Sequence, residues 1–209
     1  MFDWTSNIRV SAKLSLGFGL VLGLALLLAS TGWYAITTLT DRGVKIEKIA
    51  QISDYTKDLR ISRLRLGANP LPDAYQPLQK ILGNLAAHLQ NINTQFTAPI
   101  DQQLIQQQNT SVKEYGQLLV DLAKPNADQV PIFKRMGQLG DLLLDTTQKL
   151  IDSQNTKRDA DAASAKVLLG LVAALTLLLG ALAAWIITQQ IVNPLQYTLQ
   201  AVNRIARGD

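Results

Sequence analysis

The chain has 209 residues, of which 47% are hydrophobic and 17% are charged, and it contains no cysteine. The missing cysteines exclude disulfide bonds, thiolate metal sites and thiol catalysis. The net charge of +4 is small and the sequence has no long run of Lys and Arg, so nucleic acid is not an expected partner.

The charged residues are unevenly distributed along the chain. No charged residue occurs between Leu14 and Thr40 or between Val167 and Asn203, so all 20 basic and 16 acidic residues lie outside these two stretches. The remaining sequence has the composition of an ordinary globular domain. The pattern therefore predicts a polar domain between two hydrophobic spans, which excludes a simple cytosolic enzyme.

Residues 14–36 and 167–187 are the two predicted transmembrane helices. At about 1.5 Å per residue, each is long enough for a hydrocarbon core of about 30 Å. The first is also longer than the apolar core of a cleaved signal peptide. Trp33, Tyr34 and Trp185 stand near the ends of the spans, where amphipathic rings favour the headgroup level.

Basic residues flank the spans in both tails, residues 1–13 and 188–209. By the positive-inside rule both tails are expected in the cytoplasm, since a loop as long as residues 37–166 crosses largely regardless of its charge. The domain at 37–166 is then periplasmic, and the protein is expected in the inner membrane in contact with its lipids.

Apolar residues in the domain recur at spacings of three and four, and alternating strand patterns are absent. One helix continues from the first span to Gly67, and others are predicted over about 73–96 and from Asp101, a plausible N-cap, to about 122. A fourth begins near Pro131 and runs into the second span. Short, Pro-containing connections then give an all-α, antiparallel up-down-up-down four-helix bundle, continuous with two transmembrane helices.

After the second span, Pro194 marks a break or kink. Leu195, Leu199, Val202 and Ala206 follow at 4-3-4 spacing, the pattern of a short coiled-coil seam. Because this seam follows directly on the membrane helix, Pro194, Leu195, Leu199 and Val202 are the predicted signal-transmission residues.

The pattern V-N-P-L-x-x-x-L-x-x-V-x-x-I-A-x-G-D over 192–209 resembles the first helix of a HAMP linker. The order of span, bundle, span and linker resembles the sensory half of a bacterial methyl-accepting chemotaxis receptor, and residues 8–18 are similar to the start of such receptors. The resemblance covers essentially the whole chain and implies a homodimer. It also implies a cytoplasmic histidine kinase and a coupling protein as partners, reached through a C-terminal part beyond this truncated linker.

Arg60, Arg63 and Arg65 form the densest basic cluster outside the spans. Arg60 and Arg63 share a helix face, whereas Arg65 points about 140° from Arg60, so three arginines converge only if two chains pair. Guanidinium groups bind carboxylates through paired hydrogen bonds, which favours a small-molecule anion as ligand. The alternative is that these are solvated arginines paired with Asp54, Asp58 or Asp73.

The resemblance adds one residue to this candidate site. Receptors of the aspartate-sensing kind bind amino or organic acids with arginines of the first helix and polar groups early in the fourth. Their arginine spacings are five and four, whereas the spacings here are three and two, which leaves the ligand open between an organic acid and an amino acid. Gln129, just before the predicted fourth helix, lies about where the helix-four contact of that type would fall.

Other polar residues carry no chemical motif. His88 is alone, so no metal site is expected, and Gln102, Gln103, Gln106, Gln107 and Gln108 are typical of a solvated helix face. No nucleophile motif, phosphate loop or dinucleotide fingerprint occurs, so neither an enzyme nor a cofactor is expected.

Three functions fit this layout. The first is the sensory module of a chemoreceptor, which passes a ligand signal through the second span. The second is the sensor half of a histidine kinase or another HAMP-linked sensor, and the third is a membrane anchor without a ligand. The chain after Asp209 discriminates the first two, since a long coiled coil or a kinase core would follow.

Overall fold

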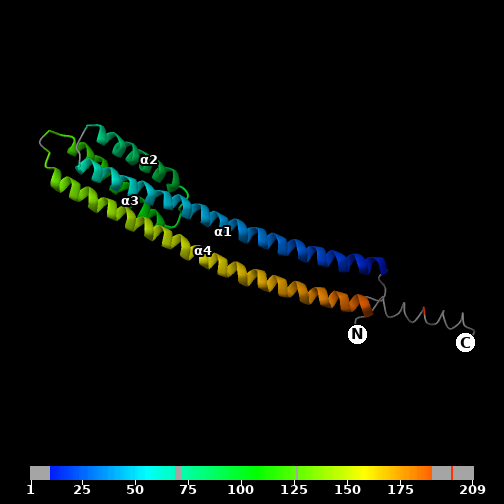
Figure 1. Cartoon of the computed structure of the whole chain (residues 1–209). Coiled ribbons are helices and arrows are strands. Elements are labelled where there is room, and N and C mark those ends of the chain that lie inside the picture. The colour runs from blue at the N-terminus through cyan, green and yellow to red at the C-terminus, as the bar shows by residue number, and fades with distance from the viewer. Residues whose placement is uncertain (1–9, 69–71, 126, 190–198, 200–209) are drawn as a thin grey trace, which may run out of the picture. The chain divides into compact units, whose positions relative to one another are not determined.

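The computed structural model describes residues 10–68, 72–125, 127–189 and 199, and those residues form helices and their connections, without a strand. The helices are α1 (Val10–Ala68), the short 3₁₀ turn η2 (Pro72–Ala74), α2 (Tyr75–Asn93), α3 (Pro99–Leu122) and α4 (Gln129–Ile187) (Figure 1). The predicted all-α class is confirmed. So is the uninterrupted continuation of the first apolar stretch into the first helix of the domain.

The chain divides into two compact units, one formed by Leu39–Ala160 and the other by the segments on either side of it. In the first unit, α2 and α3 pair closely and lie beside the adjoining parts of α1 and α4 (Figure 1). The connections after α2 and α3 are short, so successive helices run in opposite directions and form a four-helix bundle.

The bundle core follows the 3-4 spacing of a coiled-coil seam. On α3, the buried residues Ile105, Val112, Tyr115, Leu119 and Leu122 recur at that spacing. The matching buried apolar residues of the other helices include Ile49, Ile52, Leu59, Leu66, Leu78, Leu85, Leu89, Ile92, Met136, Leu139, Leu143 and Leu150. Each fully buried Leu or Ile side chain contributes about 1.5–3 kcal/mol relative to an exposed one. These buried residues belong to the apolar pattern of three and four from which the helices were predicted.

Two polar residues of α3 occupy positions in the same seam, and this corrects the sequence prediction. Gln108 was expected on a solvated face but is fully buried, where its Nε2 donates to Thr147 Oγ1 at 3.0 Å. Asp101 was expected as an N-cap, but α3 begins two residues earlier with Ala98 as its N-cap. The Asp101 side chain is 2% exposed and accepts hydrogen bonds from α4 instead.

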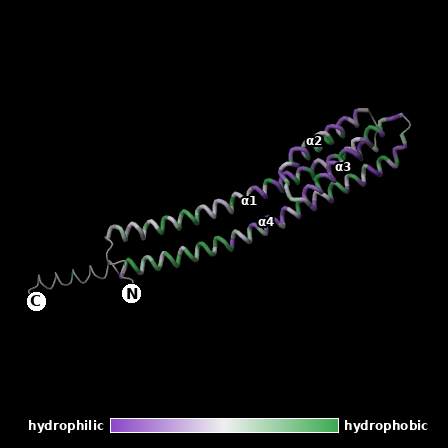
Figure 2. The backbone as a smooth tube through the Cα atoms, turned by 180° about the vertical axis from the view of Figure 1, so that it is seen from behind, coloured by the Kyte–Doolittle hydropathy of each residue, from purple (hydrophilic) through white to green (hydrophobic). Residues whose placement is uncertain are grey.

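The flanking unit contains the apolar parts of α1 and α4, which Figure 2 shows in the hydrophobic colour, in contrast to the mixed bundle. By length and composition these two helices could each cross a membrane, and their apolar windows are not buried by the described protein. Trp33 and Trp185, near the ends of the predicted spans, are 77% and 60% exposed. Gly17 allows close packing here, since a Cβ at this position would lie 2.9 Å from Ile187 Cδ1.

Candidate functional site

Two of the predicted arginines line one small cavity in the bundle, which we call the arginine cavity. It is bordered by α1, α3 and α4 through Thr56, Leu59, Arg60, Arg63, Tyr115, Met136, Gly137, Gly140, Asp141 and Leu144. Its volume of about 10 Å³ is room for about one water molecule. The site thus lies where the first helix of the domain meets the helix that runs into the second apolar span.

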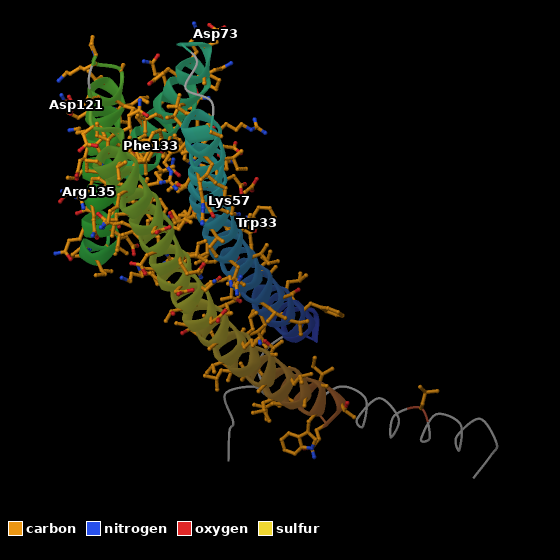
Figure 3. All side chains as sticks on the ribbon, turned by 60° about the vertical axis from the view of Figure 1, so that its left-hand side comes forward. Trp33, Lys57, Asp73, Asp121, Phe133 and Arg135 are labelled. Atoms are coloured by element: carbon orange, nitrogen blue, oxygen red, sulfur yellow. The ribbon has the colours of Figure 1, made fainter. Side chains whose placement is uncertain are left out.

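Arg63 forms the wall of this cavity between α1 and α4. Its Nη1 donates a hydrogen bond of 2.8 Å to the main-chain oxygen of Phe133, in the first turns of α4. Figure 3 labels Phe133 on that part of α4. The contact is possible because Gly137 lies one turn further on without a side chain, and a Cβ there would stand 2.7 Å from Arg63 Nη1. Arg63 therefore joins α1 to α4 directly.

Tyr115 brings a hydrogen-bonding group to the cavity from α3. The residue is 1% exposed, and its hydroxyl is buried without a hydrogen-bond partner in the described structure. Burial raises the pKa of Tyr115 to about 12, although the positive charge of Arg63 opposes that rise. The phenol is therefore neutral at ordinary pH, and its O–H is a donor at the cavity. Burying a polar group without a hydrogen bond is costly, so this hydroxyl is available to donate to a group that enters the cavity.

The cavity also contains one acidic group. Asp141 lines it from α4 and is exposed, as is Arg60 on α1. The lining thus combines two guanidinium groups, one phenol and one carboxylate. An anion accepts hydrogen bonds from the first three groups, whereas a cationic ammonium group would pair with the carboxylate.

The structure brings together only part of the predicted site. Arg60 and Arg63, which the helical spacing places on one face of α1, both line the cavity. Arg65 is exposed and absent from the lining, and Gln129, the exposed first residue of α4, also lies outside it. Pro194, Leu195 and Val202 lie outside the described residues, and Leu199 is described as exposed.

Tyr115, Asp141 and Gly137 are among the lining residues that the sequence pattern did not assign to the site. Tyr115 follows the 3-4 spacing of the apolar core of α3, and an aromatic residue at such a position usually has no other role. A signal for the α4 side did exist, since Gly137 and Gly140 are three residues apart and so lie on one helix face. Small residues on a core-facing side of a helix leave room for side chains from a neighbour.

Two other polar residues considered above, His88 and Asp54, have partners outside the cavity. His88 Nε2 lies 2.7 Å from the Lys48 main-chain oxygen, and its ring packs at 5.8 Å from Tyr55. Among the residues that the structure describes, no group of three potential metal ligands occurs. Asp54, one of the carboxylates considered as an arginine partner, lies 3.4 Å from Lys57 Nζ instead.

Comparison with known proteins agrees with this architecture. Residues 33–131 match the family model of the helical bimodular sensor domain. The methyl-accepting chemotaxis protein McpQ of Pseudomonas putida is 27% identical over an alignment that covers 100% of this chain and 52% of McpQ. The aligned length of 329 positions exceeds the 209 residues present here, so McpQ carries internal segments without a counterpart in this chain.

Two further relatives carry the same description. The methyl-accepting chemotaxis protein McpS of Pseudomonas putida is 49% identical over 65 residues, 31% of this chain and 10% of McpS. McpK of Pseudomonas aeruginosa, also a methyl-accepting chemotaxis protein, is 27% identical over 73% of this chain and 23% of McpK. The chain thus spans about half the length of McpQ and less of the others.

The helical bundle and the two helices that could cross a membrane are consistent with the sensor region of a membrane receptor. The matches then confirm the more particular resemblance predicted from the sequence, to the sensory region of a methyl-accepting chemotaxis protein.

Proposed function

We propose that this chain is the sensory module of a transmembrane chemoreceptor that binds a small organic acid or amino acid at the arginine cavity. The observation that carries the proposal is the convergence of Arg60, Arg63 and the partnerless Tyr115 hydroxyl on one cavity between α1 and α4. The descriptions of the three relatives support a receptor in chemotaxis. They favour it over the alternative, the sensor half of a histidine kinase or another HAMP-linked sensor.

The proposed ligand contacts follow from the lining groups. A carboxylate accepts hydrogen bonds from the guanidinium groups and from the Tyr115 hydroxyl, and this satisfies the orphaned donor. Charge-assisted hydrogen bonds of this kind are about twice as strong as neutral ones. Asp141 would repel a second carboxylate but would pair with an ammonium group, so the lining favours an α-amino acid over a dicarboxylate.

Because the cavity is small, ligand binding must be coupled to a movement of the helices around it. With room for about one water, the cavity must widen before it admits a carboxylate and its carbon atoms. Widening moves the Arg63 contact with Phe133, which holds α4 to α1. A ligand that binds only the wider arrangement shifts the population toward it, and α4 carries that change toward the second span.

We propose the remaining features of the receptor from the charge pattern of the sequence and from its resemblance to these relatives. The domain at 37–166 is periplasmic, both ends are cytoplasmic, and the spans at 14–36 and 167–187 lie in inner-membrane lipid. Two copies pair as a homodimer. Residues 188–209 begin a HAMP linker that leads to a cytoplasmic part controlling a histidine kinase through a coupling protein.

The test uses the full chain in detergent. Its thermal unfolding is followed against a panel of amino acids, dicarboxylates and monocarboxylates at constant ionic strength. A ligand at 100 times its Kd stabilises the folded state by about 2.7 kcal/mol, a shift of several degrees. The stabilisation should be lost in Arg60→Ala and reduced in Tyr115→Phe. It should remain in Arg65→Ala, a matched control that removes an exposed arginine of the same helix.

The variants also separate the possible ligands. If the ligand is an amino acid, Asp141→Asn should weaken its binding and leave the binding of monocarboxylates unchanged. Equal losses in Arg60→Ala and Arg65→Ala would contradict the site, because they would reflect only the change in net charge. A panel without any stabilising compound would contradict direct binding by this module.

A further inference from the structure

Helices α3 and α4 are joined by polar side chains that recur at a fixed interval. The buried Asp101 of α3 accepts a hydrogen bond of 2.7 Å at Oδ2 from Gln154 Nε2 of α4. Seven residues further along α3, the buried Gln108 donates from Nε2 to Thr147 Oγ1 at 3.0 Å. Thr147 lies seven residues before Gln154, so both pairs belong to one antiparallel register, with about two helical turns per step. We call this series of facing positions the polar ladder.

The first step of the ladder makes Asp101 a buried link between α3 and α4. Besides the bond from Gln154, its carboxylate accepts hydrogen bonds of 2.7 Å from Ser153 Oγ and 2.6 Å from Lys157 Nζ, both on α4. Lys157 balances the charge of the carboxylate. Sliding α4 along α3 would separate these groups, and buried polar groups are costly without their partners. The first two steps therefore fix the register between the two helices.

The same register places Tyr115 of α3 opposite Gly140 of α4, seven residues beyond Gln108 and seven before Thr147. Both residues line the arginine cavity. The Tyr115 hydroxyl is buried without a hydrogen-bond partner in the described structure. Gln108 Oε1 also has none, but Gln108 bonds through its Nε2, whereas the hydroxyl is the only polar group of the tyrosine side chain. The third step thus has a donor on α3 and no acceptor side chain on α4.

Packing does not account for the glycine at position 140. A Cβ there would have no atom within 4 Å, in contrast to position 137, where a Cβ would meet Arg63. Position 140 is also within helix α4, where glycine is less favourable than alanine. The missing side chain does, however, leave the Tyr115 hydroxyl open to a group that enters the cavity.

We propose that Gly140 is a specificity-determining position of the arginine cavity, which keeps the third step of the ladder open for a ligand. This inference rests on the proposed function, because the ligand is the group that completes the step. A carboxylate accepts from Tyr115 of α3, and an ammonium group of the same molecule pairs with Asp141 of α4. An α-amino acid thereby joins α3 to α4 at the third step, as side chains do at the first two.

Thr147 shows how a hydroxyl on α4 completes a step. Its Oγ1 donates to the Leu143 main-chain oxygen at 2.6 Å and still accepts from Gln108. Gly140→Ser places a hydroxyl at the corresponding position of the third step, in a cavity with room for about one water. It should accept from Tyr115 and close the step without a ligand. Gly140→Ala is the matched control, because it adds the same Cβ without the acceptor.

The first arm of the test measures unfolding midpoints of the full chain in detergent without an added compound. The difference between Gly140→Ser and Gly140→Ala is compared in the unchanged chain and in Tyr115→Phe, so that the helix propensities of serine and alanine cancel. Relative to Gly140→Ala, Gly140→Ser should be favoured by about 2–4 °C more when the tyrosine is present, the shift for one net hydrogen bond in a chain of this size. A difference near zero would overturn the proposal, because position 140 would then not face the hydroxyl.

The second arm adds the panel of amino acids, dicarboxylates and monocarboxylates to the unchanged chain and to the two variants of Gly140. Gly140→Ser should need about tenfold more of a stabilising amino acid for the same shift of the midpoint, whereas Gly140→Ala should respond as the unchanged chain does. Equal losses in the two variants would overturn the proposal, because they would reflect only the added volume.

The two arms also separate this inference from the proposed function. If the panel stabilises the unchanged chain but the first arm shows no dependence on Tyr115, the inference fails and direct binding stands. If the first arm shows that dependence but no compound stabilises the unchanged chain, direct binding fails, and the role of a ligand at the third step fails with it.

Discussion

Gly137 on α4 lies directly against the guanidinium group of Arg63 on α1, so that a Cβ at this position would stand 2.7 Å from Arg63 Nη1. The hydrogen bond from Arg63 to the Phe133 main chain depends on this contact, because any side chain at 137 displaces the guanidinium.

Gly137→Ala therefore tests whether the position of Arg63 matters for sensing. The alanine gains up to about 1 kcal/mol in helix propensity but displaces Arg63, so the unfolding midpoint should change little. The ligand-induced shift of the midpoint should fall sharply. Thermal unfolding with and without the ligand measures both quantities.

Gly83→Ala provides the control for that experiment. Gly83 is also within a helix of the bundle, lies outside the arginine cavity, and has no atom within 4 Å of an added Cβ. The Gly83→Ala variant should be more stable because of its higher helix propensity, and it should keep the full ligand-induced shift of the unfolding midpoint. If Gly137→Ala also keeps the full response, the Arg63 contact with α4 is not part of the sensing mechanism.

Tyr115 gives a prediction at alkaline pH. Its pKa is raised to about 12 in the folded chain, against about 10 in the unfolded chain, so the folded state holds its proton more tightly. The resulting stability is fully present below pH 10 and is lost as the pH rises through 12. By linkage, the unchanged chain should lose about 2–3 kcal/mol more than Tyr115→Phe over this interval.

The measurement compares unfolding midpoints of the two chains between pH 9 and 12 in detergent. Lysines titrate in both chains, so their effect cancels in the difference. Near pH 7 the phenylalanine variant should be as stable as the unchanged chain, or up to about 1 kcal/mol more stable, since it removes a buried hydroxyl without a partner. Parallel losses of stability above pH 10 would contradict the burial assigned to this hydroxyl.

Much of the fold could be predicted from the sequence because helix formation and membrane insertion depend on local patterns. The 3-4 spacing of Ile49, Ile52 and Leu59 identified a core face without knowledge of any partner helix. The same local geometry placed Arg60 and Arg63 on one face. Such inferences need only the period of the helix.

The polar groups of the core could not be predicted in this way. Gln108 and Thr147 are 39 positions apart in the sequence, and Asp101 and Gln154 are 53 apart. A buried polar residue is stable only when its partner lies opposite, and that depends on the register between α3 and α4. The role of Tyr115 was missed for the same reason, since only the packed bundle brings its hydroxyl to Arg63.

Glu114 and Arg135 provide a prediction at acidic pH. Arg135 Nε and Nη2 donate to the two carboxylate oxygens of Glu114 at 2.6 and 3.0 Å, and Figure 3 labels Arg135 on α4. This hydrogen bonding lowers the pKa of Glu114 below its usual value, with a smaller contribution from the charge of Arg135. The pair's stabilising effect is therefore present above the unfolded pKa of 4.5 and is lost as the pH falls through the lowered value.

Arg135→Gln should lower the unfolding midpoint at pH 7. It should have no effect at a pH where Glu114 is protonated in both the folded and the unfolded state. Added salt should also diminish the difference at pH 7, because the pair is exposed to solvent. Lys124→Gln removes a cation from another surface pair, that with Asp121, and controls for the change in net charge. A difference that persists unchanged at acidic pH would assign the effect of Arg135 to packing rather than to the ion pair.

Asp101 gives the largest expected effect on stability. Asp101→Asn keeps the shape of the side chain but removes the charge that balances Lys157, and it leaves one oxygen to accept where two did. Breaking a buried, hydrogen-bonded charge pair costs about 3–5 kcal/mol, and the partial exposure of Lys157 places this one near the lower end. Asp121→Asn makes the same chemical change at a solvent-exposed pair, where about 0–1 kcal/mol is expected. Thermal unfolding of the two variants at pH 7 tests the difference, and equal midpoints would contradict the role of Asp101 as the link between α3 and α4.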